Sequence, residues 1–142
     1  MPHLIVEYSA NLEKQINISD LLHKVHAAAL GTGVFELAAV RTRAARRDHY
    51  VIADDHKDNV FVAVLVRIGT ARDAEIRKSL GETIFKAVCA YLDATCKNAP
   101  IGISLEVQEI DPTGAFRKNN LHAIVKERAA GAASTKTNEG VS

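Results

Sequence analysis

The sequence contains the pattern strand, helix, strand twice in succession, and this duplication limits the folds that are open to the chain. In the first copy, an alternating strand over residues 2–8 is followed by an amphipathic helix and an extended segment from about 37 to 52. A polar turn over 54–59 separates the copies. In the second copy, a β-branched strand at 60–68, another amphipathic helix and a strand at 101–110 follow in the same order.

Both expected helices have recognisable ends. The first starts at the N-cap residue Asn17 and stops at Gly31–Gly33. The second is opened by the box Thr70–Asp73 and ended by Asn98–Pro100. Between these ends, apolar residues recur three and four positions apart, so each helix has one apolar stripe that must be buried.

The duplication predicts the fold class, α+β. A helical crossover makes its two flanking strands parallel, and right-handed crossovers place the helix on a defined face of the sheet. We therefore expect a four-stranded mixed sheet with two helices on one face. The strand at 60–68 is almost continuously apolar, as in a strand buried on both faces. The uncovered sheet face therefore predicts self-association.

The C-terminal part reads differently from the duplicated part. Asp111–Gly114 has the composition of a tight turn, and residues 116–126 are expected to form one further short element, helix or strand. From 127 to 142 the chain has almost no bulky apolar residue, so we expect a disordered tail. Residues 1–126 are then a single domain.

Composition excludes several classes of protein. The net charge of +1 gives no reason to expect a nucleic-acid partner, even though a basic run spans 41–47. No apolar run approaches a membrane span, and residues 1–8 lack the layout of a signal peptide, so a cytoplasmic location is expected. Cys89 and Cys96 lie two helical turns apart, too far to bridge, and are expected to be free thiols.

Pro2 is the candidate catalytic residue. If Met1 is removed, Pro2 becomes the first residue and carries a free secondary amine at the start of an apolar strand. An α-amino group has a pKa of only about 7.7–8.0, and burial or nearby cations lower it further. Such an amine can act as a neutral base at pH 7. If Met1 remains, the Pro2 nitrogen is an amide and has no basic lone pair.

Four stretches of the sequence together resemble one family. They are Met1–Ser9, Ala38–Arg43, Ile68–Arg72 and Asp111–Ala123. With the proline-led strand and the duplicated unit, they resemble the tautomerase superfamily and, within it, the 5-carboxymethyl-2-hydroxymuconate Δ-isomerases. The resemblance spans roughly residues 2–126.

The resemblance implies a homotrimer and an isomerase without cofactor or metal, acting in homoprotocatechuate (4-hydroxyphenylacetate) catabolism. Its substrate would be a polycarboxylate dienol. Pro2 would be the base, and Arg41 and Arg72 would hold substrate carboxylates. Guanidinium groups suit this role because they bind planar oxyanions through two parallel hydrogen bonds.

Several residues keep two interpretations. Arg43 shares a strand face with Arg41 and could assist it, or could be a solvated surface arginine. Lys118 and Asn120 could line a neighbouring subunit's site or serve subunit packing. His23 and His26, at i and i+3, could form a metal pair, but no third ligand is evident and no metal is expected.

Two other functions stay open at this point. One is a keto–enol tautomerase that acts on a smaller acid and needs a single arginine. The other is a trimeric binding module that keeps the fold without turnover.

Overall fold

A computed structural model describes residues 1–70 and 72–139, and side chains up to residue 133. Four strands form one mixed sheet in the order β2-β1-β3-β4. Strands β1 and β2 are parallel, β3 and β4 are parallel, and β1 is antiparallel to β3, which confirms the predicted topology. The strands are β1 (His3–Ser9), β2 (Arg41–Arg47), β3 (Val60–Gly69) and β4 (Ile101–Ile110).

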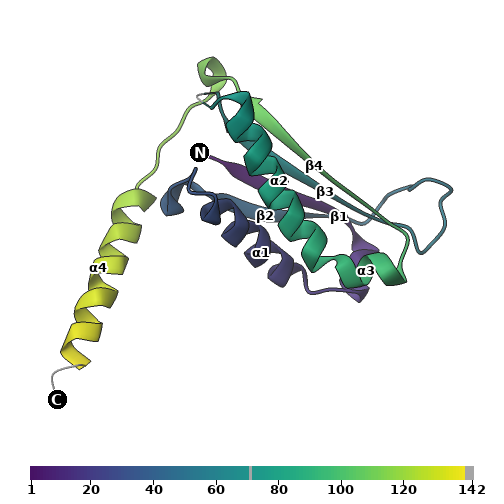
Figure 1. Ribbon diagram of the computed structural model, residues 1–142, viewed down its shortest axis with the longest axis horizontal. Coiled ribbons are helices and arrows are strands. Elements are labelled where there is room, and N and C mark those ends of the chain that lie inside the picture. Colours follow the sequence, from purple (N-terminus) through teal and green to yellow (C-terminus); the bar gives the residue numbers. More distant parts are fainter. Residues whose placement is uncertain (71, 140–142) are drawn as a thin grey trace.

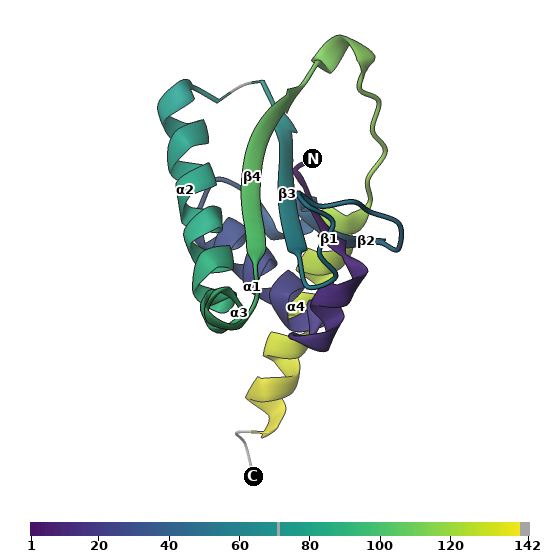
Figure 2. The same cartoon turned by 90° about the vertical axis from the view of Figure 1, so that its right-hand side faces the viewer.

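The two long crossover helices lie on the same face of this sheet, as expected (Figures 1 and 2). The α-helices are α1 (Ile18–Gly31), α2 (Ala74–Tyr91), α3 (Asp93–Asn98) and α4 (Leu121–Glu139). Three short 3-10 helices complete the described chain: η1 (Ala10–Lys14), η2 (Leu37–Ala39) and η3 (Pro112–Gly114). Helix α4 extends away from the rest of the molecule (Figure 1).

The N-cap of α1 is the one predicted from the sequence, whereas the N-cap of α2 is a different residue. The Asn17 side chain accepts a hydrogen bond from the Asp20 amide at 3.2 Å, which confirms the predicted N-cap of α1. Helix α2 is capped by Asp73, whose carboxylate accepts from the Ile76 amide at 2.8 Å, and so begins later than a cap at Thr70 would place it. Ala71, which is part of the predicted box, lies outside the described residues.

The core lies between the helices and one face of the sheet. Along β3 the buried residues alternate with partly exposed ones, so the prediction of a strand buried on both faces is wrong for the single chain. Leu65 and its cross-strand partner Ile5 lie on the uncovered face and are only partly buried. The residues packed between the sheet and the helices are fully or almost fully buried. They are Leu4, Val6 and Tyr8 of β1, Val62, Val64 and Val66 of β3, and Leu80, Ile84 and Val88 of α2.

Two segments differ from the predicted elements. The extended segment expected over 37–52 contains only the seven residues of β2, because residues 37–39 turn as η2. The chain over 115–120 has no regular structure, and α4 begins at Leu121. The backbone of 127–139 continues this helix, in keeping with the high helix propensity of its alanines. Disorder of the tail stays a prediction. Residues 140–142 lie outside the described chain.

Candidate active site

A cavity of about 410 Å³ lies at the start of β1, where the N-terminus meets three other parts of the chain. Met1 and Pro2 form one wall, and Phe35 and Glu36, just before η2, form a second. Further lining residues come from the end of β3 and the approach to α2, and from the C-terminal segment: Gly69, Arg72, Arg117 and His122.

Pro2 is buried in this cavity, and strand pairing fixes its backbone. The Arg41 amide donates a hydrogen bond to the Pro2 carbonyl at 3.1 Å, directly before the parallel ladder of β1 and β2 begins. The chain in the structure carries its terminal amine on Met1, which lines the same cavity. Burial lowers the pKa of this amine below its usual value, and the charges of Arg117, Arg41 and Arg72 lower it further.

Arg72 is held beside Pro2 by the segment that precedes η2. Its guanidinium donates to the Val34 carbonyl at 3.2 Å and lies over the Phe35 ring at 5.2 Å from the ring centroid. These contacts leave most of the five N–H donors of the guanidinium unused. Arg72 therefore presents a fixed, partly exposed cation to the cavity.

Arg41 is placed differently from Arg72. One of its terminal nitrogens donates to the carbonyls of Ala38 and Ala39, at 3.1 and 2.6 Å, and Arg41 is not among the lining residues of the cavity. It stabilises the turn η2 and contributes positive charge near the terminal amine. Its direct contact with substrate stays a prediction.

The other predicted substrate ligands are not brought together with Pro2 in the described chain. Arg43 donates to Nδ1 of His3 at 3.0 Å, on the uncovered face of the sheet. Lys118 and Asn120 are exposed and do not line the cavity.

The structure adds three groups that sequence reasoning did not select. Arg117 lies within the resemblance motif after β4 but was not singled out there. Glu36 and His122 form an ion pair across the cavity at 3.1 Å between carboxylate oxygen and Nδ1. No periodicity marks these residues, because all three lie outside strands or in the first turn of a helix.

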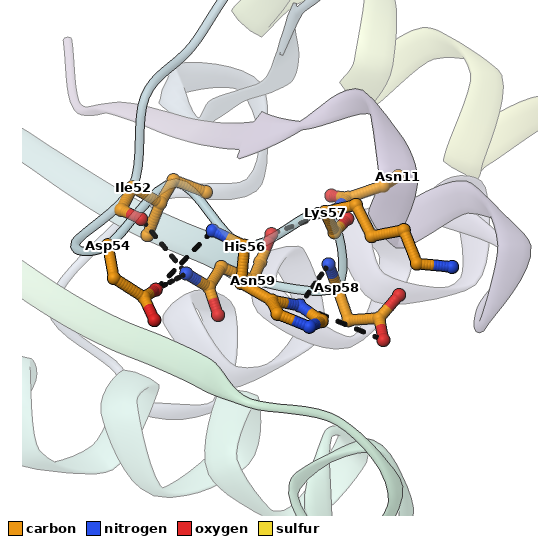
Figure 3. A network of polar contacts seen from close by, with 7 residues as sticks. All are labelled: Asn11, Ile52, Asp54, His56, Lys57, Asp58 and Asn59. Carbon is orange, nitrogen blue, oxygen red and sulfur yellow. Dashed lines mark hydrogen bonds and ion pairs between the residues drawn. The ribbon is translucent and has the colours of Figure 1, made fainter.

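The polar turn at 54–59 is a structural network at the other end of β1 (Figure 3). The Asn59 amide donates to the Ile52 carbonyl at 2.9 Å and to the Asp54 carboxylate at 2.8 Å. Asn11, which follows β1, donates to the Asn59 carbonyl at 2.8 Å. This loop is therefore held by its own hydrogen bonds, as a turn was predicted to be.

The remaining candidate groups are explained by local contacts. His23 Nδ1 contacts the Ser19 carbonyl and His26 Nδ1 contacts the Thr42 hydroxyl, so the two histidines are engaged separately. In the described part of the chain, no group of three potential metal ligands is found. Over the same residues, none of the helices combines the length and apolar character that crossing a membrane requires.

Two of the four arginines in the basic run over 41–47 are paired with carboxylates. Arg46 pairs with Glu13 and Asp48, and Arg47 pairs with Glu7. These ion pairs leave no continuous positive strip along β2.

Comparison with known proteins gives a consistent family. The family model of 5-carboxymethyl-2-hydroxymuconate isomerase matches residues 2–125. The 5-carboxymethyl-2-hydroxymuconate Delta-isomerase of Escherichia coli is 34% identical over 126 residues, which cover 89% of this chain and 100% of that protein.

Solved structures agree with the sequence comparisons. A 5-carboxymethyl-2-hydroxymuconate isomerase from Deinococcus radiodurans R1 has a TM-score of 0.81 and 31% identity, over 87% of this chain and 93% of its own. A fused 4-OT protein, described as a symmetric trimer, shares the fold alone, with a TM-score of 0.57 and 16% identity over 82% and 93% of the two chains. The chain therefore belongs to the 5-carboxymethyl-2-hydroxymuconate isomerase family and is an isomerase.

Proposed function

We propose that this isomerase moves a proton within 5-carboxymethyl-2-hydroxymuconate, with the amine of Pro2 as the base after Met1 is removed. The observation that carries the proposal is the position of the chain terminus. Met1 and Pro2 line the same cavity, and burial and nearby arginines lower the pKa of the Met1 terminal amine there. We expect the same effects to act on the Pro2 amine once Met1 is removed. A lowered pKa keeps the amine neutral, and so able to accept a proton, near pH 7.

The reaction needs only a base and a stabilised anion. The Pro2 nitrogen accepts the proton of the 2-hydroxyl group, and the electron pair of the O–H bond forms the ketone as the double bonds shift. The same proton is then delivered to a carbon of the diene, where a C–H bond forms. Substrate and product are isomers, so no oxidant, reductant or cofactor enters the balance. Positive charge from Arg72 stabilises the intermediate anion.

A homotrimer accompanies this proposal. The sheet face opposite the helices presents apolar residues such as Ile5 and Leu65 between charged ones such as Glu7 and Glu106, and it bounds a shallow cavity of about 210 Å³. Burying this face against two further copies would remove its apolar surface from water. A monomer in sedimentation at micromolar concentration would contradict the trimer.

The proposal also assigns the isomerase a place in metabolism. The relatives are named as isomerases of 5-carboxymethyl-2-hydroxymuconate, and on that basis we propose that this chain acts in homoprotocatechuate catabolism. Growth of a deletion strain on 4-hydroxyphenylacetate tests this assignment, and unimpaired growth would contradict it.

The experiment that tests the catalytic proposal controls the N-terminus. Intact mass first verifies removal of Met1, and turnover of 5-carboxymethyl-2-hydroxymuconate is then compared with that of protein carrying an uncleaved N-terminal extension. We expect the extended form to lose about 10²- to 10⁴-fold in kcat, the usual contribution of a general base. Pro2→Ala, which leaves a primary amine, should lose less but still substantially. His3→Ala, on the opposite face of β1, is the matched control. Full activity of the extended form would contradict the proposal.

A further inference from the structure

The segment between η3 and α4 brings an unpaired cation to the cavity. Arg117 lies in the irregular stretch 115–120 and lines the cavity together with Pro2 and Arg72. Among the described residues it has no hydrogen-bond or ion-pair partner, in contrast to Arg43, Arg46 and Arg47 of β2. Its guanidinium is therefore free to bind a ligand.

The conformation of this segment aims Arg117 at the cavity. Phe116 is 92% exposed and does not line the cavity, whereas the next residue, Arg117, does. The ion pair between Glu36 and His122 holds the end of the segment against the cavity rim. Arg117 is thus positioned from both sides.

The charges around the cavity favour an anion with more than one carboxylate. Arg72 and Arg117 come from different segments of the chain and approach the same space. The carboxylate of Glu36 is the one acidic group among the lining residues, and it is already paired with His122. Arg41 donates to two carbonyls of η2 and does not line the cavity, whereas Arg117 does.

We propose that Arg117 binds a second carboxylate of the substrate and so sets the preference of this isomerase for polycarboxylates over monocarboxylates. The inference rests on the proposed function for its substrate class. Arg72 holds one carboxylate near the Pro2 nitrogen, and Arg117 holds the carboxylate at the far end of the molecule. Fork-shaped guanidinium groups at two points fix the orientation of an extended dienol as well as its charge.

The test compares three dienols that differ in their number of carboxylates. They are 5-carboxymethyl-2-hydroxymuconate, 2-hydroxymuconate without the carboxymethyl arm, and the monocarboxylate 2-hydroxypenta-2,4-dienoate. Rates are measured at about pH 9, above the usual pKa of an α-amino group, so that a change in the charge of Pro2 does not enter the comparison. The variants are Arg117→Gln, Arg117→Lys and, as a control on exposed α4, Arg128→Gln.

We expect Arg117→Gln to lower kcat/KM about 10- to 150-fold for the tricarboxylate 5-carboxymethyl-2-hydroxymuconate. This range corresponds to the loss of a hydrogen bond to a charged group. The monocarboxylate should change by less than about threefold. Arg117→Lys should recover part of the loss, since a lysine keeps the charge but not the fork. Arg128→Gln should change nothing. An equal loss on all three substrates, or no loss on any, would overturn the inference.

A binding measurement separates this inference from the proposed function. Calorimetry with two unreactive probes, propane-1,2,3-tricarboxylate and butyrate, needs no turnover. Weaker binding of the tricarboxylate alone in Arg117→Gln supports the inference even if the wild-type protein does not turn over the dienol. Equal affinity of wild type and Arg117→Gln for the tricarboxylate overturns it, even if the isomerase reaction is confirmed.

Discussion

Two of the cavities in the described chain are similar in size but opposite in chemistry. The cavity between α2 and β4 has a volume of about 500 Å³, slightly more than the 410 Å³ of the cavity at the N-terminus. Its floor is largely apolar, from Phe85, Leu105 and Val107. Its basic residues are paired, since Arg77 lies 2.6 Å from Glu109 and Lys78 lies 3.9 Å from Glu82.

The two cavities differ in the chemistry of their lining more than in volume, so volume alone does not identify the candidate active site. The larger cavity lies where α2 packs against the edge strand β4. At Gly81, an added Cβ would come within 3.2 Å of the Val107 side chain. The smaller cavity contains a chain terminus and cations without acidic partners. This contrast supports our proposal that the chemistry takes place in the N-terminal cavity and not in the α2–β4 cavity.

The largest effect should come from the buried face of α2, in the core. Leu80 is 1% exposed, and Leu80→Ala should lower the free energy of unfolding by about 2–5 kcal/mol, the cost of a buried leucine with its cavity. Chemical denaturation measures this change. The activity of the folded fraction should stay within about threefold of wild type, because distant sites act independently.

Phe85→Ala is the matched control for Leu80→Ala. Phe85 lies on the same helix and is 38% exposed, so its truncation should cost clearly less stability. Equal destabilisation by both substitutions would show that the α2–β4 cavity is more than a packing feature.

A smaller effect, confined to activity, should come from the N-terminal cavity. Arg72→Gln should lower kcat/KM for the dienol about 10- to 150-fold, because it removes the charged donors that face the substrate. Lys78→Gln, at the α2–β4 cavity, is the control and should leave the steady-state kinetics unchanged. If Lys78→Gln is as damaging as Arg72→Gln, the assignment of chemistry to one cavity is wrong.

The fold could be predicted almost completely because it follows from periodicity. The alternating apolar residues of β1 and the apolar stripes of α1 and α2 indicate which face each element buries. The duplicated order of strand, helix and strand indicates how the strands pair. The C-terminal segment was harder. The alanine-rich sequence of 127–139 lacks an apolar stripe, so only helix propensity indicated α4.

The site was predictable only where one residue has unusual chemistry. Pro2 is recognisable because a proline amine at a chain terminus is a rare base. Arg72 was predicted as a substrate ligand only because the sequence resembles the isomerase family. Arg117 and the pair Glu36–His122 reach the cavity through the path of an irregular segment, and no local pattern in the sequence determines that path.

The central claim is that the cavity makes the terminal amine of Pro2 a neutral base. The most direct test is an ¹⁵N NMR titration of the Pro2 amine in protein from which Met1 has been removed. We expect a pKa below the 8.0 of an ordinary terminal amine, because Pro2 lines the same cavity as Met1, and burial and the charges of Arg117, Arg41 and Arg72 lower the pKa of the Met1 amine there. The kcat/KM should then fall as the pH drops through that value, since the protonated amine cannot accept a proton. Arg117→Gln should raise the pKa. A pKa at or above 8.0, unchanged in Arg117→Gln, would contradict the account.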